Sequence, residues 1–281
     1  MRMRLCEDRG ETMTKKKKLW IMLPCIAVGL AVLIVVWLMV CGYFWTWGPF
    51  SEMASLRYKK LAGNSDAYAV ETVEPLADSP LAGKHVLFLG SSVTYGAASL
   101  QTSFAEYLAR HNTMTFVKEA VSGTTLVDSG INSYIARMKR LDGNEAFDFV
   151  VCQLSTNDAT QKKPLGKIAA EGEAFDTSTV CGAIEYIIQY VRDTWHCSVV
   201  FYTNAYYESA EYSAMVDALF SIQEKYGIGV IDLYTDTAFN AISEESRALW
   251  MADAIHPTRA GYLQWWTPKM EQELFRLFPK A

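Results

Sequence analysis

The sequence predicts a three-layer α/β/α sandwich, built on a mainly parallel five-stranded sheet and preceded by one transmembrane helix. The sandwich is indicated by the region after residue 84, where apolar strands alternate with amphipathic helices. Strands that are apolar on both faces are typical of parallel sheets covered by helices on both sides. The transmembrane helix is indicated by residues 19–51, which contain no charged side chain and exceed the roughly 20 apolar residues that cross a bilayer.

The charges on either side of the apolar segment predict its orientation. Four lysines at residues 15–18 precede it, and Glu52 follows it. Because basic residues stay on the cytoplasmic side, we expect a single-pass protein of the cell membrane with its N-terminus inside. A cleaved signal peptide is the alternative, but its apolar region is usually about 7–15 residues long and is followed by a small-x-small site, which is not seen here. The expected parts are a cytoplasmic basic tail (1–18), a transmembrane signal-anchor helix (19–45), an extracytoplasmic stalk or linker (46–82) and a folded domain (83–281).

Charge and cysteine content narrow the class of protein further. The formal net charge is −5, which argues against a nucleic-acid partner. Three cysteines fall in the folded domain: Cys152, Cys181 and Cys197. The helix expected between the last two would hold them about 20 Å apart, well beyond the roughly 7 Å that a disulfide allows. We therefore expect small core residues and no disulfide framework, in a domain that is monomeric.

The predicted elements follow one another in a regular order from residue 85. "HVLFLGSS" is an apolar strand that ends in hydroxyl side chains, and "SFAEYLARHN" has the apolar spacing of a helix. The later strands are mostly apolar runs, and the later helices each have one apolar face. The expected strands cover residues 85–92, 115–123, 147–158, 197–205 and 228–234, and the expected helices cover 103–112, 131–141, 178–195, 213–227 and 257–278.

Polar residues gather where these strands end. In open parallel sheets, sites lie beyond the carboxyl ends of the strands, so these residues should share one rim of the sheet. His85 and His196 precede strands, and His111 ends a surface helix, so they lie elsewhere. Among the four histidines, only His256 is expected to reach the serines. The residues at the rim are Ser91 and Ser92 after the first strand, Gly123 after the second, Asn157 and Asp158 after the third, and Asp253 and His256 after the last.

The spacing of Asp253 and His256 indicates acid–base chemistry. Three residues apart on a helical turn or in a tight loop, the two side chains face the same way. The carboxylate can accept the proton on one ring nitrogen, which leaves the other nitrogen as a base. A serine hydroxyl is a weak nucleophile until such a base takes its proton. The alternative is that "DAIHP" is only a helix entry capped by Asp253.

Four short blocks together resemble the SGNH (GDSL-type) hydrolase family, in the family's order and over about residues 83–279. "FLGSSVTYG" is similar to the nucleophile block and implies Ser92 as nucleophile. "VSGTT" and "STND" are similar to the blocks whose glycine and asparagine, here Gly123 and Asn157, complete an oxyanion hole with the Ser92 N–H. "DAIHP" is similar to the final Asp-x-x-His block and implies Asp253 and His256 as the other triad members. The resemblance implies a flavodoxin-like sandwich with residues 83–281 as its catalytic domain.

Two positions depart from the family pattern. Ser91 stands where the family commonly has Asp, and Ser155 stands where it commonly has Gly. Neither change removes a catalytic group, but both leave the subfamily and the substrate open. Side chains alternate along a strand, so Ser91 should point away from the side that Ser92 faces. Asp158 is expected to accept hydrogen bonds from a loop backbone.

The resemblance implies a membrane-anchored serine esterase that needs no metal and no cofactor. Its expected partners are the membrane and a small-molecule or glycan ester, with O-acetyl groups of cell-envelope glycans as the leading substrate. Tyr95, Tyr206 and Tyr207 follow strand ends and could stack on a sugar, although the last two could equally pack under the closing helix. The alternatives are an acyltransferase with the same acyl-serine chemistry, a lysophospholipase or other lipid esterase, a glycan-binding module with a decayed site, and a flavodoxin-like nucleotide binder that places "GSSVTYG" on phosphate.

Overall fold

The computed structural model describes residues 3–45, 49–50 and 53–280, and the chain forms two compact units, Met1–Arg57 and Tyr58–Ala281. The first unit contains the long helix α1 (Met3–Trp45) and all but the last residue of the short helix α2 (Ala54–Tyr58). Within α1, the stretch Met22–Tyr43 has a mean hydropathy of 2.8 and is long and apolar enough to cross a bilayer. A signal sequence near the N-terminus can meet the same criteria of length and composition, so the anchor and its orientation stay predictions.

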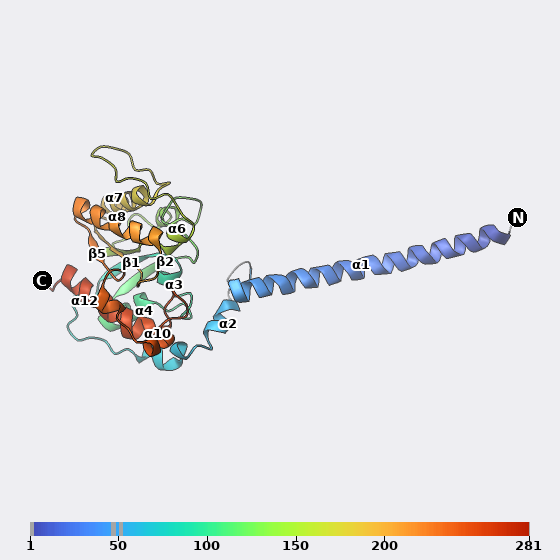
Figure 1. The fold of residues 1–281 in the computed structure, drawn as a ribbon, viewed down its shortest axis with the longest axis horizontal. Helices are drawn as coiled ribbons and strands as arrows, with labels where there is room; N and C mark the ends of the chain where they lie inside the picture. The colour runs from blue at the N-terminus through green and yellow to red at the C-terminus, as the bar shows by residue number, and fades with distance from the viewer. Residues whose placement is uncertain (1–2, 46–48, 51–52, 281) are drawn as a thin grey trace. The chain divides into compact units, whose positions relative to one another are not determined.

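The second unit is built on a five-stranded parallel sheet, which confirms the predicted fold class (Figure 1). The strand order is β2-β1-β3-β4-β5, and every neighbouring pair is parallel. Parallel pairing brings the carboxyl ends of all five strands to one rim, where the polar residues of the sequence were expected. The strands are β1 (His85–Gly90), β2 (Thr115–Ala120), β3 (Phe149–Gln153), β4 (Ser198–Tyr202) and β5 (Gly229–Ile231).

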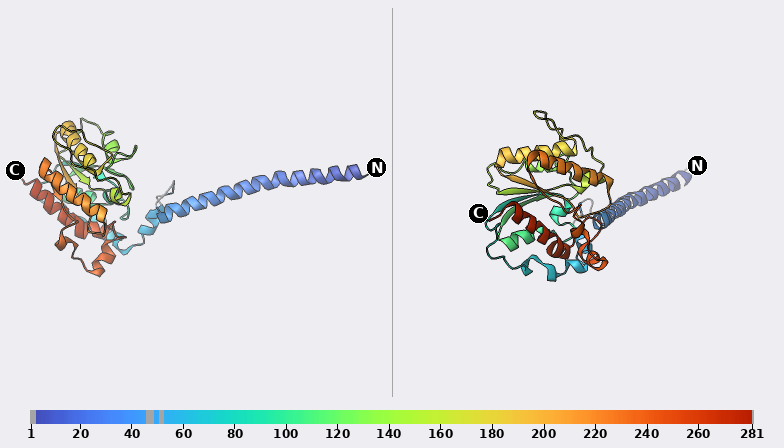
Figure 2. Two further views of the ribbon diagram at one scale, coloured as in Figure 1. Left: turned by 45° about the horizontal axis from the view of Figure 1, so that its top comes forward. Right: turned by 60° about the vertical axis from the view of Figure 1, so that its left-hand side comes forward.

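Helices cover both faces of the sheet and form the outer layers (Figures 1 and 2). Alternate residues of each strand point to opposite faces. Leu87 thus packs in the core beneath α7 (Val180–Trp195) and α8 (Ala210–Tyr226), and Phe88 packs in the core beneath α4 (Phe104–Asn112) and α12 (Thr267–Leu277). Burial on both faces explains why the strands read as apolar runs. The three cysteines of this unit, Cys152, Cys181 and Cys197, are free thiols, and the first two are buried as expected.

Two predicted helices are shorter or less regular than the sequence indicated. The helix expected at 131–141 is reduced to α5 (Tyr134–Met138). Ser133 caps its N-terminus by accepting a hydrogen bond from the Ala136 N–H. The closing helix expected at 257–278 is divided into α11 (Arg259–Gly261), a π-helical turn (Tyr262–Trp266) and α12. Pro268 lies in the first turn of α12 and has no N–H to donate to the preceding turn, so the regular α-helical pattern is interrupted there. The other short helices are α3 (Ser92–Tyr95), α6 (Thr156–Thr160), α9 (Thr237–Asn240) and α10 (Glu244–Trp250), with 3₁₀ turns at Ala62–Asn64, Asp66–Tyr68 and Val70–Thr72.

The segment that the sequence indicated as a stalk belongs in large part to the folded unit. The compact unit begins at Tyr58 and not at residue 83. Asn64 is buried, and its side-chain amide donates to the carbonyl oxygens of Tyr58 (2.9 Å) and Ala98 (2.8 Å) while its oxygen accepts the Arg259 N–H (2.8 Å). Leu81 is fully buried. The linker boundary at 82 is therefore corrected, because one buried asparagine ties this aperiodic segment to two distant parts of the chain.

Candidate active site

The three side chains predicted to form a triad meet at the carboxyl rim of the sheet. Ser92 is the first residue of α3, which is separated from β1 by Ser91 alone, and its Oγ lies 2.8 Å from Nε2 of His256. His256 Nδ1 lies 2.9 Å from Oδ2 and 3.0 Å from Oδ1 of Asp253. Ser92 and His256 are 164 residues apart in the chain, so only the fold could bring them within hydrogen-bond distance.

Asp253 also fixes the backbone of the loop that carries His256. Its Oδ1 accepts the N–H groups of Ile255 and His256, each at 2.8 Å. The loop is closed by a bond from the Ala252 N–H to the His256 carbonyl (2.9 Å) and by a β-bridge between Met251 and Pro257. The "DAIHP" segment is therefore a tight loop and not the start of a helix.

Electrostatics keep the Asp253 carboxylate ionised. Burial acts to raise its pKa, but the hydrogen bond and charge of His256 and the two backbone N–H groups outweigh it and lower the pKa from 3.8 to about 2. An ionised carboxylate favours the tautomer with the proton on Nδ1. The lone pair of Nε2 then faces the Ser92 hydroxyl, which is the arrangement that activates a serine by general base catalysis.

Two of the residues predicted for an oxyanion hole lie on neighbouring segments that are bonded to each other: Gly123 in the loop after β2 and Asn157 in α6. The Asn157 side-chain amide donates to the Thr124 carbonyl (3.0 Å), and the Gln161 side-chain amide approaches the Gly123 carbonyl (3.4 Å). The first of these bonds uses one of the two amide hydrogens of Asn157 and leaves the other free to donate. Among the residues that the structure describes, no acceptor pairs with the backbone N–H of Ser92 or of Gly123. Three donors thus remain for a negatively charged oxygen.

Comparison with known proteins establishes the family. Residues 88–263 match the model of the GDSL-like lipase/acylhydrolase family, which is more than half of the chain.

The chain belongs to the GDSL-like lipase/acylhydrolase family.

Solved structures similar to this GDSL-like chain agree with its fold. One is a protein from Lactobacillus plantarum, at 19% identity and a TM-score of 0.58 over 70% of this chain and 96% of that one. A second, from Bacteroides ovatus and described as a GDSL-like lipase, is 18% identical with a TM-score of 0.52 over 71% and 100%. A third is a family two carbohydrate esterase from Clostridium thermocellum in complex with cellohexaose, at 14% identity and a TM-score of 0.52 over 74% and 66%. No curated protein matches the chain.

The turn that carries Ser92 departs from the usual GDSL pattern and is held by Gln153, which sequence reasoning missed. Gln153 ends β3 and is fully buried. Its Oε1 accepts the Ser91 N–H (2.9 Å), the Thr94 hydroxyl (2.9 Å) and, at 3.2 Å, the Ser91 hydroxyl. Ser91 therefore bonds away from His256, as strand alternation predicted. A polar residue at the end of an apolar strand was the feature that could have pointed to Gln153.

Glycine is required at position 90 of the same turn by close packing. A Cβ on Gly90 would lie 1.7 Å from Thr94 Oγ1 and 2.9 Å from Gln153 Oε1. No larger side chain fits without displacing the buried bonds behind the nucleophile. The glycine therefore lets the strand end pack directly against the side chains that orient Ser92.

Arg137 connects the nucleophile turn to the loop of Gly123, and it too was missed. The side chain comes from α5 and is 1% exposed. Its Nη2 donates to the Gly90 carbonyl (2.7 Å) and lies 3.2 Å from Thr124 Oγ1, and its Nη1 donates to the Glu119 carbonyl (2.6 Å). One guanidinium thus fixes the ends of β1 and β2 relative to each other. Arg137 lies three residues after the buried Tyr134 and therefore on the same face of the helix, which was the indication in the sequence that its side chain could be buried.

Asp158 and Ser155 hold the third block in place. Asp158 is buried and accepts the N–H groups of Leu126 (2.8 Å) and Val127 (3.1 Å), which is the backbone role expected for it. Burial raises its pKa, although these bonds act in the opposite direction. Ser155, in place of the usual glycine, accepts the Asn157 N–H (3.1 Å) at the start of α6. Within the part of the chain that the structure describes, no three His, Cys, Asp or Glu side chains form a group that could hold a metal ion.

Proposed function

We propose that this chain is a membrane-anchored serine esterase that uses Ser92, His256 and Asp253 as its triad. The observation that carries the proposal is the 2.8 Å separation of Ser92 Oγ and His256 Nε2, with His256 Nδ1 bonded to Asp253. Membership of a family of lipases and acylhydrolases supports ester bonds as the target.

The reaction follows from this geometry. Ser92 Oγ attacks the ester carbonyl carbon and its proton passes to His256 Nε2. The tetrahedral intermediate then releases the alcohol, which takes the proton back from Nε2, and the acyl group remains on Ser92. Water attacks this acyl-serine and gives a proton to Nε2. The second tetrahedral intermediate then releases the carboxylic acid, and Ser92 Oγ takes the proton back from Nε2. Asp253 stays ionised throughout and stabilises the transient imidazolium.

The oxyanion of each tetrahedral intermediate would be held by the backbone N–H groups of Ser92 and Gly123 and by the Asn157 amide. The free state of these donors supports the proposal. Removal of one such donor typically costs about 10²–10³ in rate.

A small hollow beside Gly123 favours a short acyl group. It has a volume of about 280 Å³, and six of its nine lining residues have polar side chains, including Thr124, Asn132 and Gln161. Each methylene group that is buried in an apolar environment contributes about 0.8 kcal/mol to binding. A site for a long fatty acyl chain would therefore be an apolar channel that buries many of them. The exposed Ile131 is the one large aliphatic side chain of this lining. An acetyl ester fits such a surface better than a lipid ester does.

The membrane anchor suggests where that ester is found. The apolar stretch Met22–Tyr43 follows the lysines of residues 15–18, so the folded unit would face the extracytoplasmic side. There it would meet the glycans of the cell envelope, and O-acetyl groups on those glycans are the proposed substrates. The topology can be tested by adding protease to intact cells, which should digest an epitope at the C-terminus and spare one at the N-terminus.

The test of the catalytic assignment uses the full chain in detergent with two matched variants. Ser92→Ala should lose both labelling by a fluorophosphonate and hydrolysis of p-nitrophenyl acetate. Ser91→Ala removes the adjacent hydroxyl and should keep both. Labelling of Ser92→Ala would refute the proposal. Product analysis with and without a glycan acceptor separates hydrolysis from acyl transfer, since a transferase would form an acylated glycan in place of free acid.

A further inference from the structure

A second hollow, larger than the one beside Gly123, lies at the carboxyl ends of β4 and β5. Its volume is about 490 Å³. It is lined by Tyr206 from the loop after β4, by Ser213 from α8 and by side chains of the segment 234–241 after β5. This size lies within the usual range of about 300–1,000 Å³ for sites that bind small molecules.

The residues that line this hollow are uncharged, and five of the seven carry a hydroxyl group, while most of the lining surface is apolar. None of the lining side chains carries a charge. The hydroxyls of Tyr206, Ser213 and Thr237 make no side-chain hydrogen bond to any other residue that the structure describes, so they are available to a ligand. Phosphate and carboxylate groups are normally met by Arg or Lys, which are missing from this lining. The hollow therefore suits an uncharged ligand that has both an apolar face and hydroxyl groups.

Tyr206 gives the hollow an exposed aromatic wall. Its side chain is 53% exposed, and its ring centroid lies 5.3 Å from that of the buried Tyr234. The Tyr206 backbone N–H donates to Asn240 Oδ1 (2.9 Å), which fixes the start of the side chain. A tyrosine presents a large amphipathic surface at a low cost in conformational entropy. The C–H face of a pyranose ring packs on such a surface while its hydroxyls reach the polar groups around it.

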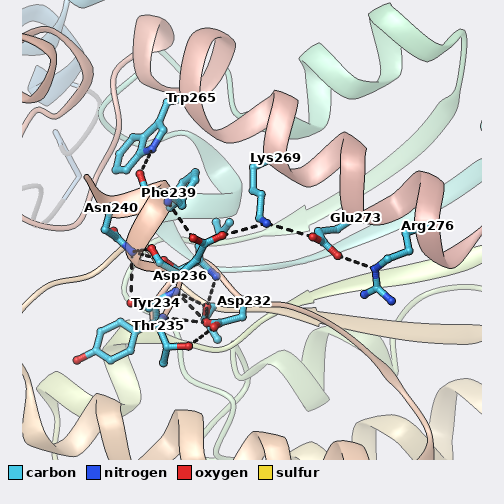
Figure 3. A network of polar contacts seen from close by, with 12 residues as sticks. Asp232, Tyr234, Thr235, Asp236, Phe239, Asn240, Trp265, Lys269, Glu273 and Arg276 are labelled. Atoms are coloured by element: carbon cyan, nitrogen blue, oxygen red, sulfur yellow. Dashed lines mark hydrogen bonds and ion pairs between the residues drawn. The ribbon is translucent and has the colours of Figure 1, made fainter. Parts of the chain in front are cut away.

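The segment 234–241, which lines the hollow together with Tyr206, is held by a network of polar contacts (Figure 3). Asn240 Nδ2 donates to the carbonyl oxygens of Leu233 (2.7 Å) and Asp236 (2.8 Å). Asp236 caps α9 through the Phe239 N–H (2.9 Å) and forms an ion pair with Lys269 of α12 (3.0 Å). A preformed wall reduces the ordering cost of binding.

The loop that carries Tyr206 contacts the loop that carries His256. Asn204 comes two residues before Tyr206, and its Nδ2 lies 3.5 Å from the carbonyl oxygen of Ile255, the residue before His256. Two residues span at most about 7 Å of chain. His256 returns its proton to the leaving oxygen, so the alcohol part of the ester must lie on the side of His256. The hollow therefore borders the position of the alcohol, whereas the hollow beside Gly123 borders the oxyanion donors.

We infer that the hollow beside Tyr206 binds a neutral pyranose unit of the glycan whose ester is cleaved, with the sugar ring stacked on Tyr206. The inference rests on the proposed esterase function and adds the chemical class of the alcohol and the residue that selects it. It also opposes a lysophospholipid, whose phosphate would meet no cation in this hollow.

The test compares two acetyl esters that differ only in the alcohol: p-nitrophenyl acetate and O-acetylated xylo-oligosaccharides. In the full chain in detergent, Tyr206→Ala should raise KM for the oligosaccharide about tenfold, the equivalent of one good aromatic contact of about 1.4 kcal/mol. It should leave kcat/KM for p-nitrophenyl acetate within twofold. Tyr206→Phe keeps the ring and loses only the hydroxyl, so its KM for the oligosaccharide should stay much closer to wild type than that of Tyr206→Ala. Tyr186→Ala, on α7, is the control for loss of a tyrosine elsewhere.

The outcomes separate this inference from the proposed function. An unchanged oligosaccharide KM in Tyr206→Ala, or an equal rise for both esters, would overturn the sugar site and leave the esterase intact. Hydrolysis of p-nitrophenyl acetate by Ser92→Ala would instead overturn the proposed function. Calorimetry of Ser92→Ala with xylohexaose, cellohexaose and chitohexaose tests binding without turnover. Binding that Tyr206→Ala abolishes supports the site, and no binding to any of the three overturns it.

Discussion

Replacement of Arg137 by lysine should loosen the connection between the nucleophile turn and the oxyanion loop. The change keeps the positive charge but replaces a planar group of five donors by a single nitrogen. Arg137 reaches partners in three directions: the Gly90 carbonyl, the Glu119 carbonyl and the Asn132 carbonyl. The single ammonium group of lysine cannot donate to all three carbonyl oxygens, because three different nitrogens of the planar guanidinium make these bonds.

The size of the effect follows from the bonds that are lost. If lysine keeps one carbonyl partner, two hydrogen bonds from a charged donor disappear, and such bonds contribute about 1.5–3 kcal/mol each. The Gly90 carbonyl also accepts the Val121 N–H at 3.3 Å, which offsets part of the loss. We therefore expect the free energy of unfolding to fall by about 3 kcal/mol, which lowers Tm by about 6–12 °C in a unit of this size.

The assay is thermal unfolding of the full chain in detergent, followed by near-ultraviolet circular dichroism, with p-nitrophenyl acetate hydrolysis measured well below Tm. The matched control is Arg140→Lys on the same segment, since the exposed Arg140 donates to one carbonyl, that of Ile131. The control should shift Tm by less than about 2 °C, because exposed substitutions usually stay within about 0.5 kcal/mol. For Arg137→Lys we also expect kcat to fall with little change in KM. A Tm and a kcat equal to those of wild type would refute the reasoning.

Three further substitutions test the site. Gly90→Ala should reduce activity and destabilise the folded unit by about 1–3 kcal/mol or more, because the new Cβ overpacks the turn. Gly143→Ala is the control and should be tolerated, because its new Cβ would meet its nearest atom at 3.4 Å. Equal Tm values for the two variants would contradict this prediction. Gln153→Leu removes the acceptor of the buried Ser91 N–H, so urea unfolding should show a loss of about 1–3 kcal/mol, and an unchanged midpoint would count against that role. Asp253→Asn should lower kcat by about 10⁴, as in other triads. Because the Asp253 pKa is lowered from 3.8 to about 2, its contribution to stability is complete above pH 4–5 and disappears as the pH falls towards 2. The stability difference between wild type and Asp253→Asn should therefore be constant at neutral pH and shrink below about pH 4, and an equal difference at pH 7 and pH 2.5 would show that the carboxylate charge is not its source.

The five-stranded parallel sheet could be predicted because its evidence is local. An apolar run such as "HVLFLG" and the helical spacing of "SFAEYLARHN" are visible in single segments, and their alternation limits the topology. Parallel strands then place their carboxyl ends together, so Ser92, Gly123 and Asn157 could be assigned to one rim before any contact was known. Asp253 and His256 lie at the same rim, and their spacing indicated how one orients the other.

Features that depend on single long-range contacts could not be predicted in this way. Arg137 reaches Gly90 across 47 residues, and Gln153 reaches Ser91 across 62. Asn64 reaches Arg259 across 195 residues, which is why residues 58–82 were expected to be a linker and yet belong to the folded unit. The periodicity of the sequence does not indicate such contacts, because each contact is made by a single polar side chain in a segment with no other unusual feature.

The amino-acid sequence alone was enough to predict the class of fold, the order of the elements and the edge of the sheet at which a site should lie. These follow from hydrophobic periodicity and from the geometry of parallel strands, both of which act over a few residues at a time. The tertiary structure decided that Ser92 and His256 approach to 2.8 Å, that Arg137 and Gln153 hold the loops around them, and that a neutral hollow opens beside Tyr206. These features depend on hydrogen bonds that buried polar groups form when distant segments pack together. Burial of a polar group without a hydrogen-bond partner costs so much free energy that arrangements which leave such groups unpaired are disfavoured.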